Sequence, residues 1–169
     1  MSRVVLIGCV KGKLDRPAPA RDLYISDLFA LRRRYAEASG HPWGVLSALH
    51  GVLDPDRVIA PYDWTIAQRW TKTGGFYHWA GSVIQGCYFL RSGVTNHSSY
   101  DERAATDFTS RLTVEIHAGK DYVDLIRMCG LPQWPPTVHI EHPVAGMGIG
   151  EQKQFYRHNE YEYPTFNFE

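Results

Sequence analysis

The first apolar run of the chain constrains its fold more than any other stretch. Residues 3–9 read Arg-Val-Val-Leu-Ile-Gly-Cys, with no polar side chain between Val4 and Ile7. An uninterrupted β-branched run of this kind is typical of a strand that is buried on both faces, as the central strands of parallel sheets are. Because parallel strands are joined by crossovers, we expect helices against both faces of the sheet.

Three later runs have the same character, at residues 43–49, 112–119 and 137–140. Between the first two strands, Ser26 can cap a helix that runs to about Ser39, with Arg32, Arg33 and Arg34 mostly outward. Further helices are expected at 121–128 and after the glycines near residue 148. This alternation predicts one α/β domain over residues 1–169, with three layers and a four-stranded, mostly parallel sheet flanked by helices.

Residues 64–110 have a less regular pattern. A helix is expected to start at Asp63 or Thr65, an aromatic cluster occupies 76–79, and residues 101–110 again look helical. The segment is too long for one crossover, so we predict a crossover helix with an aromatic-rich insertion that overhangs the strand ends. Aromatic residues make up 13% of the chain, and such rings pack in a core more often than they stack on a ligand.

Composition narrows the class of protein. A chain of 169 residues can bury one full core. The formal net charge is zero, so there is no overall electrostatic attraction to nucleic acid, although residues 1–40 carry eight basic and four acidic side chains. The three cysteines are widely spaced, which argues against a zinc site. No signal peptide or membrane-length apolar run is present, so we predict a cytoplasmic protein with free thiols.

Chemically useful side chains follow the second strand closely. Residues 47–63 are rich in glycine and proline, which predicts a turn-rich loop. The alternative is a surface loop whose aspartates only form Asx-turns. The side chains of interest here are those of Ser47, His50, Asp54, Asp56, Tyr62 and Asp63.

The other strands also end in polar groups. Because the carboxyl ends of parallel strands meet at one edge, these groups predict an active site there. Lysines beside a glycine, and glycines before a helix, suit the binding of a phosphate. The groups are Cys9, Lys11 and Lys13 after the first strand, His117 in the third, and Gly148, Gly150, Glu151 and Gln152 after the fourth.

This set of groups favours acid–base chemistry on a phosphate-bearing substrate, such as hydrolysis of an N-glycosidic bond. We expect Asp54 to position water or to stabilise the sugar cation, with His50 and Glu151 assisting. The remaining groups would bind substrate and phosphate. The chain has no G-x-S-x-G motif and no recognisable set of metal ligands, and we expect no cofactor.

Six short motifs can be read along the chain: Cys9-x-Lys11-x-Lys13, Leu23-Tyr24-x-Ser26-x-x-Phe29, Leu46-Ser47-Ala48-x-His50-Gly51-x-Leu53-Asp54-Pro55, Pro61-Tyr62-Asp63, His117-Ala118-Gly119 and Pro143-x-Ala145-Gly146-x-Gly148-Ile149-Gly150-Glu151-Gln152. Together they resemble a family of small uncharacterised α/β domains that is common in actinobacteria and phages. The first motif and the Tyr24-x-Ser26 part of the second are also distantly similar to a module of archaeal deazaguanine tRNA-modification enzymes. Anti-phage DNA glycosylases that excise glucosylated hydroxymethylcytosine are a further resemblance.

Three functions follow as hypotheses. The first is a DNA glycosylase acting on a modified pyrimidine, with a role in phage defence, in which Asp54→Asn abolishes activity and keeps DNA binding. The second is an N-glycosidase acting on nucleoside monophosphates, which the zero net charge favours. The third is a nucleotide-binding module without catalysis. A divalent ion held by Asp54, Asp56 and Asp63 would indicate a nuclease instead, and the sequence leaves the oligomeric state open.

Overall fold

The computed structural model describes residues 2–68, 75–93, 110–130, 132 and 134–159. Their main feature is a five-stranded sheet in the order β4-β3-β1-β6-β7, in which all neighbouring pairs are parallel except β3 and β4. The strands are β1 (Ser2–Gly8), β3 (Trp43–Ser47), β4 (Gly51–Leu53), β6 (Leu112–His117) and β7 (Val138–Glu141). Two short strands, β2 (Ala18–Pro19) and β5 (Val58–Ile59), form a separate antiparallel pair.

Strand β1 is central, as its apolar sequence predicts. It pairs in parallel with β3 on one side and β6 on the other. Side chains of alternate residues point to opposite faces of a strand. Accordingly, Val5 and Ile7 belong to one core cluster, and Val4 and Leu6 belong to another.

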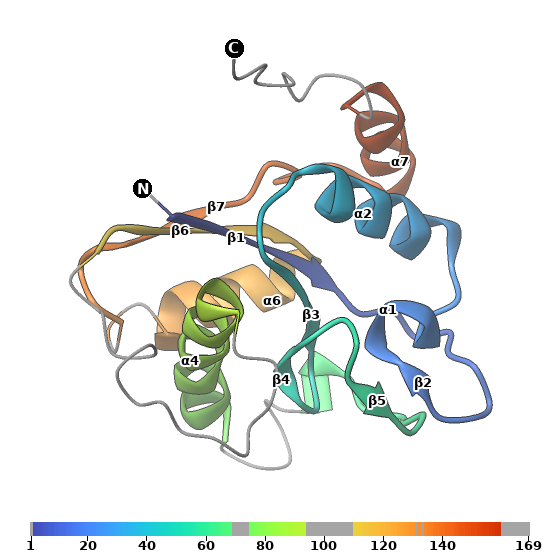
Figure 1. Ribbon diagram of the computed structural model, residues 1–169, viewed down its shortest axis with the longest axis horizontal. Coiled ribbons are helices and arrows are strands. Elements are labelled where there is room, and N and C mark those ends of the chain that lie inside the picture. The colour runs from blue at the N-terminus through green and yellow to red at the C-terminus, as the bar shows by residue number, and fades with distance from the viewer. Residues whose placement is uncertain (1, 69–74, 94–109, 131, 133, 160–169) are drawn as a thin grey trace.

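Helices pack against both faces of the sheet (Figure 1). On one face lie α2 (Asp27–Ala38) and α7 (Ile149–His158). On the other lie α4 (Phe76–Ser92) and α6 (Lys120–Leu125), which continues into the π-helical turn Ile126–Gly130. The short helix α1 (Ala20–Leu23) follows β2. The described residues thus form a mixed α/β fold with a mostly parallel sheet.

The sheet has five strands and not the predicted four, because residues 51–53 are a strand rather than part of a loop. Two features return the chain after β3. The Ser47 hydroxyl oxygen accepts hydrogen bonds from the backbone amides of Leu49 and His50 at 3.2 and 3.1 Å. Gly51 then adopts a φ of +73°, which favours glycine. The second strand was predicted at 43–49 and ends at Ser47, where this turn begins.

Helix α2 confirms the predicted start at Ser26, whose hydroxyl accepts a hydrogen bond from the amide of Phe29 at 3.0 Å. The expectation that Arg32 points outward is wrong, since this side chain is only 4% exposed. Its guanidinium donates to the carbonyl of Gly8 and to the Gln152 side chain. Arg32 therefore links α2 to β1 and α7.

The predicted insertion at 64–110 can be followed only in part. Helix α4 lies within it and forms the crossover from the β3–β4 hairpin towards β6. The predicted helix at 101–110 lies outside the described residues, apart from Ser110.

Gly86 lets α4 approach β4 closely. A Cβ atom at this position would lie 2.5 Å from the Cβ of Val52. We expect Gly86→Ala to lower the free energy of unfolding by about 1–2 kcal/mol, because an overpacking cost of about 1–3 kcal/mol exceeds the gain of about 1 kcal/mol in helix propensity. Urea unfolding would measure this. Gln85→Ala, on the exposed side of α4, is the control and should shift stability by less than about 0.5 kcal/mol. A more stable Gly86→Ala protein would contradict the tight contact.

Candidate functional site

The sheet contains a point at which its connections diverge. The chain leaves β1 towards β3, whereas it leaves the adjacent strand β6 towards β7. In open α/β sheets, ligands bind in the crevice outside the carboxyl ends of such neighbouring strands. The topology therefore singles out the ends of β1 and β6.

A cavity of about 190 Å³ lies at this place. We call it the strand-end cavity. Three segments contribute to it: the chain that follows β1, the segment before α4, and the first turn of α6. The residues that line it are Cys9, Val10, Lys11, Lys13, Asp63, Trp64, Thr65, Ile66 and Tyr122.

Lys13 is a firmly held cation in the wall of the cavity. Its Nζ donates to the carbonyls of Val10 and Lys11 at 3.2 and 3.3 Å and lies 4.4 Å from the centre of the Tyr62 ring. Burial lowers the pKa of Lys13, while the nearby Cys9 and Asp63 oppose this effect. Lys11, in contrast, is exposed and can reach a ligand outside the cavity.

A chain of hydroxyl groups lies behind Lys13. The Ser47 hydroxyl is 2.7 Å from that of Tyr62, which is 2.8 Å from that of Tyr24. Because Ser47 Oγ already accepts from two backbone amides, its own proton is directed to Tyr62. Burial raises the pKa of both tyrosines, so both phenols are neutral near pH 7.

Tyr122 is a cavity residue that the sequence analysis missed. Its hydroxyl is 3.1 Å from Sγ of Cys9, and burial raises its pKa. It lies in the first turn of α6, just after β6. Its place directly after a predicted strand end was the signal available in the sequence.

The structure brings together about half of the predicted site residues. Cys9, Lys11, Lys13 and Asp63 line the cavity. Ser47 and Tyr62 lie directly behind Lys13 through the contacts described above. His50 is exposed in the turn between β3 and β4, and its ring makes an edge contact with that of Tyr62 at 5.2 Å.

Asp54 does not lie at the cavity. Strand β4 runs antiparallel to β3, with Leu53 paired to Val45, so Asp54 follows it towards the amino end of β3. Its side chain accepts a hydrogen bond from the amide of Asp56 at 2.8 Å and so forms an Asx-turn. This is the structural role that the sequence analysis gave as the alternative to catalysis. Among the described residues, no three His, Cys, Asp or Glu side chains are grouped to hold a metal ion.

The glycine-rich start of α7 is occupied by a side chain of the protein itself. The Glu151 carboxylate accepts a hydrogen bond from the amide of Gly148 at 2.7 Å and so caps the first turn of the helix. Gly148 and Gly150 are exposed, and neither these glycines nor Glu151 line the strand-end cavity. The negative charge of Glu151 already serves the helix dipole here.

His117 and Gln152 belong to a buried polar network on the α2 side of the sheet. His117 lies 2.7 Å from the carboxylate of Glu115 and 2.9 Å from the hydroxyl of Tyr156. Glu115 also accepts from Tyr35 at 2.7 Å and pairs with Arg3. Gln152 accepts from Arg32 at 2.8 Å. The network therefore joins β6 to α2 and α7. His117 and Gln152, which were predicted as site residues, do not line the strand-end cavity.

This network predicts loss of stability in acid. Burial alone would raise the pKa of Glu115, but hydrogen bonds from His117 and Tyr35 lower it to about 2. Burial also lowers the pKa of His117. Both groups therefore bind protons more readily in the unfolded state, so stability falls as the pH drops below 6.5 and falls further below 4.5.

Urea midpoints at several pH values would measure this fall, and His117→Gln should flatten its upper part. A wild-type midpoint that does not change between about pH 7 and pH 4 would contradict the prediction.

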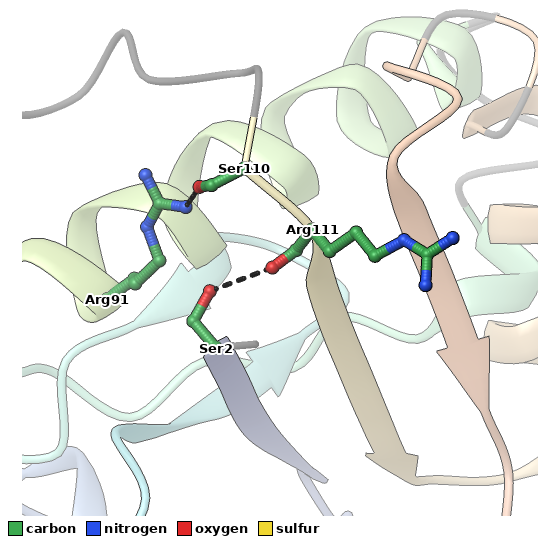
Figure 2. Close-up of a pocket in the computed structure, with 4 residues that line it drawn as sticks. All are labelled: Ser2, Arg91, Ser110 and Arg111. Atoms are coloured by element: carbon green, nitrogen blue, oxygen red, sulfur yellow. Dashed lines mark hydrogen bonds between the residues drawn. The ribbon is translucent and has the colours of Figure 1, made fainter.

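A second hollow lies at the opposite edge of the sheet (Figure 2). It has a volume of about 480 Å³ and is lined by Ser2, Arg91, Ser110 and Arg111. Ser2 donates to the carbonyl of Arg111 at 3.1 Å, and Arg91 donates to the hydroxyl of Ser110 at 2.5 Å. The two guanidinium groups point in opposite directions (Figure 2). Although this hollow is larger, the described residues that line it offer no carboxylate, thiol or histidine, so the strand-end cavity is the better candidate.

Residues 4–158 match DUF6884, which is described as a family of unknown function. The chain belongs to this family. The match runs from β1 to the end of α7, so it includes both the strand-end cavity and the buried network. The curated proteins and the solved structures yielded no match. Within the described residues, none of the helices has the length and apolar character needed to cross a membrane.

Proposed function

We propose that this DUF6884 protein hydrolyses the N-glycosidic bond of a modified pyrimidine nucleotide in DNA. The observation that carries the proposal is the lining of the strand-end cavity, which combines the cations Lys11 and Lys13 with the carboxylate of Asp63 and the hydroxyl of Tyr122. A carboxylate near the sugar and a donor near the base assist hydrolysis of this bond, and a positive charge near the phosphate holds the substrate in place.

Each cavity residue has a role in this proposal. Asp63 replaces Asp54 as the carboxylate that orients water and stabilises positive charge on the sugar, because Asp63 lines the cavity. Lys11 is exposed and contacts a phosphate, while Lys13 adds positive charge from the wall. The neutral hydroxyl of Tyr122 donates to the base. The similarity of Cys9-x-Lys11-x-Lys13 to the module of archaeal deazaguanine enzymes agrees with this chemistry.

The size of the cavity supports recognition of one part of a larger substrate. Its 190 Å³ is below the range of about 300–1,000 Å³ that is usual for sites enclosing a drug-sized ligand. A single base or sugar would enter, and the rest of the strand would stay outside. Enzymes that act on a base in DNA turn the nucleotide out of the helix in this way. If the excised base occurs only in phage DNA, the protein would act in defence against phages, in the cytoplasm.

A free nucleoside monophosphate is the second candidate substrate. The formal net charge of zero favours it, because DNA-binding proteins normally present a basic surface. The dependence of KM on salt separates the two. Binding to DNA releases several counterions, so KM for DNA would rise steeply with salt concentration. KM for a mononucleotide would rise only slightly.

The test uses the purified protein with EDTA and DNA containing different modified cytosines. Abasic sites would be counted in DNA, and free base would be measured from nucleoside monophosphates in parallel. Abasic sites in one modified DNA support the first candidate, and free base from monophosphates alone supports the second. Cleavage that requires added magnesium would overturn both.

A further inference from the structure

We propose that Cys9 is the nucleophile of the strand-end cavity and forms a covalent bond to the sugar of the substrate. This inference rests on the proposed function and deepens it. Cys9 is partly exposed and lines the cavity, whereas Cys87 and Cys129 are fully buried elsewhere. The backbone amide of Cys9 donates to the carbonyl of Leu46 at 3.0 Å, which holds the residue at the end of β1.

Two other nucleophilic side chains nearby, those of Lys13 and Ser47, are committed to protein contacts. Lys13 directs Nζ to two backbone carbonyls and lies over the Tyr62 ring. Ser47 is buried, accepts from two amides and donates to Tyr62. Cys9 is the one thiol among the described residues that faces the cavity.

A hydrogen-bond donor and a cation lie near the sulfur of Cys9. The Tyr122 hydroxyl, 3.1 Å away, is a neutral donor that can point its proton at Sγ. Burial lowers the pKa of Lys13, and its ammonium group is close enough to Cys9 that Cys9 opposes part of this lowering. Cations and hydrogen-bond donors beside a cysteine stabilise its thiolate, which is the reactive form.

The reaction proceeds in two displacements. The Cys9 thiolate attacks the anomeric carbon, the carbon–nitrogen bond breaks, and its electron pair leaves with the base. As the sulfur loses its charge, Tyr122 gives its proton to the base. Water then attacks the same carbon, Asp63 accepts one proton from the water, and the carbon–sulfur bond breaks, which restores the thiolate. Asp63 returns that proton to the Tyr122 oxygen, so one water is consumed and one base is released.

Alkylation with iodoacetamide tests the reactivity of Cys9 without any substrate. Mass spectrometry of the folded protein should show one adduct, on Cys9, with Cys87 and Cys129 unmodified as internal controls. We expect the reaction to be at least about 10-fold faster than that of glutathione at about pH 7. Tyr122→Phe should slow it several-fold, and the matched variant Tyr77→Phe, on an exposed tyrosine of α4, should not. A rate equal to that of glutathione would overturn the inference.

Activity and stereochemistry then separate the inference from the proposed function. Cys9→Ala, checked for an unchanged melting temperature, should lower kcat by at least about 100-fold. Methanol added as acceptor should yield a methyl glycoside with retained configuration, because two displacements invert the carbon twice. Inverted product, or a Cys9→Ala variant as active as wild type, would overturn Cys9 as nucleophile and keep the glycosidase. Fast, Tyr122-dependent alkylation without release of any base would overturn the glycosidase and keep the reactive thiol.

Discussion

Replacement of Glu115 by alanine is expected to lower the free energy of unfolding by about 2–5 kcal/mol. Glu115 is 2% exposed, and its Oε1 accepts hydrogen bonds from both His117 and Tyr35. Without the carboxylate, these two groups are left buried without this acceptor, and each such group costs about 1–3 kcal/mol. The contact with Arg3 adds less, because that side chain is 30% exposed and its charge is screened by solvent.

Two further variants separate these contributions in urea unfolding. Glu115→Gln keeps an oxygen for His117 and Tyr35 and loses the ion pair with Arg3, so its loss should be about 1 kcal/mol. Glu141→Gln removes the other carboxylate that binds Arg3, but its side chain is 37% exposed, and its loss should stay below about 1 kcal/mol. If Glu115→Ala were no less stable than Glu141→Gln, the buried hydrogen bonds would not hold α2 and α7 to the sheet.

Some elements of this fold can be predicted from the sequence, and others cannot. The central place of β1 followed from its buried run, and the Ser26 cap located α2. A strand of three residues such as β4 is too short for its periodicity to be recognised, and the Asp-Pro that follows it favours a loop. Glu115 left a signal, since polar and apolar residues alternate in β6, but alternation alone does not reveal that both faces are buried.

The candidate site was predictable where it depended on parallel strands. Cys9, Lys11 and Lys13 follow β1 directly. The rule that ligands bind at the carboxyl ends of parallel strands predicts them at the crevice, and they line the cavity there. The rule fails for Asp54, because the β3–β4 hairpin reverses the chain and carries this residue away from that edge. Asp63 comes back to the cavity only through the path of the chain after β5, which no local pattern encodes.

Asp63→Asn is accordingly expected to lower kcat by about 100-fold or more, with KM changed by less than about 3-fold. The side chain is exposed, so the substitution should not alter the melting temperature. The asparagine keeps the size and an oxygen but cannot accept the proton of water or stabilise the charge on the sugar. Release of base under saturating substrate would measure the effect.

Asp54→Asn is the matched control for this experiment. It makes the same chemical change in an aspartate that lies towards the other end of the β3–β4 pair, where an asparagine can still form the Asx-turn with Asp56. We expect its kcat to stay within about 3-fold of wild type. If Asp54→Asn abolished activity and Asp63→Asn did not, the catalytic carboxylate would be the one favoured by the motif. In that case the reaction would take place outside the strand-end cavity, because no rotation of the Asp54 side chain can reverse the direction of β4.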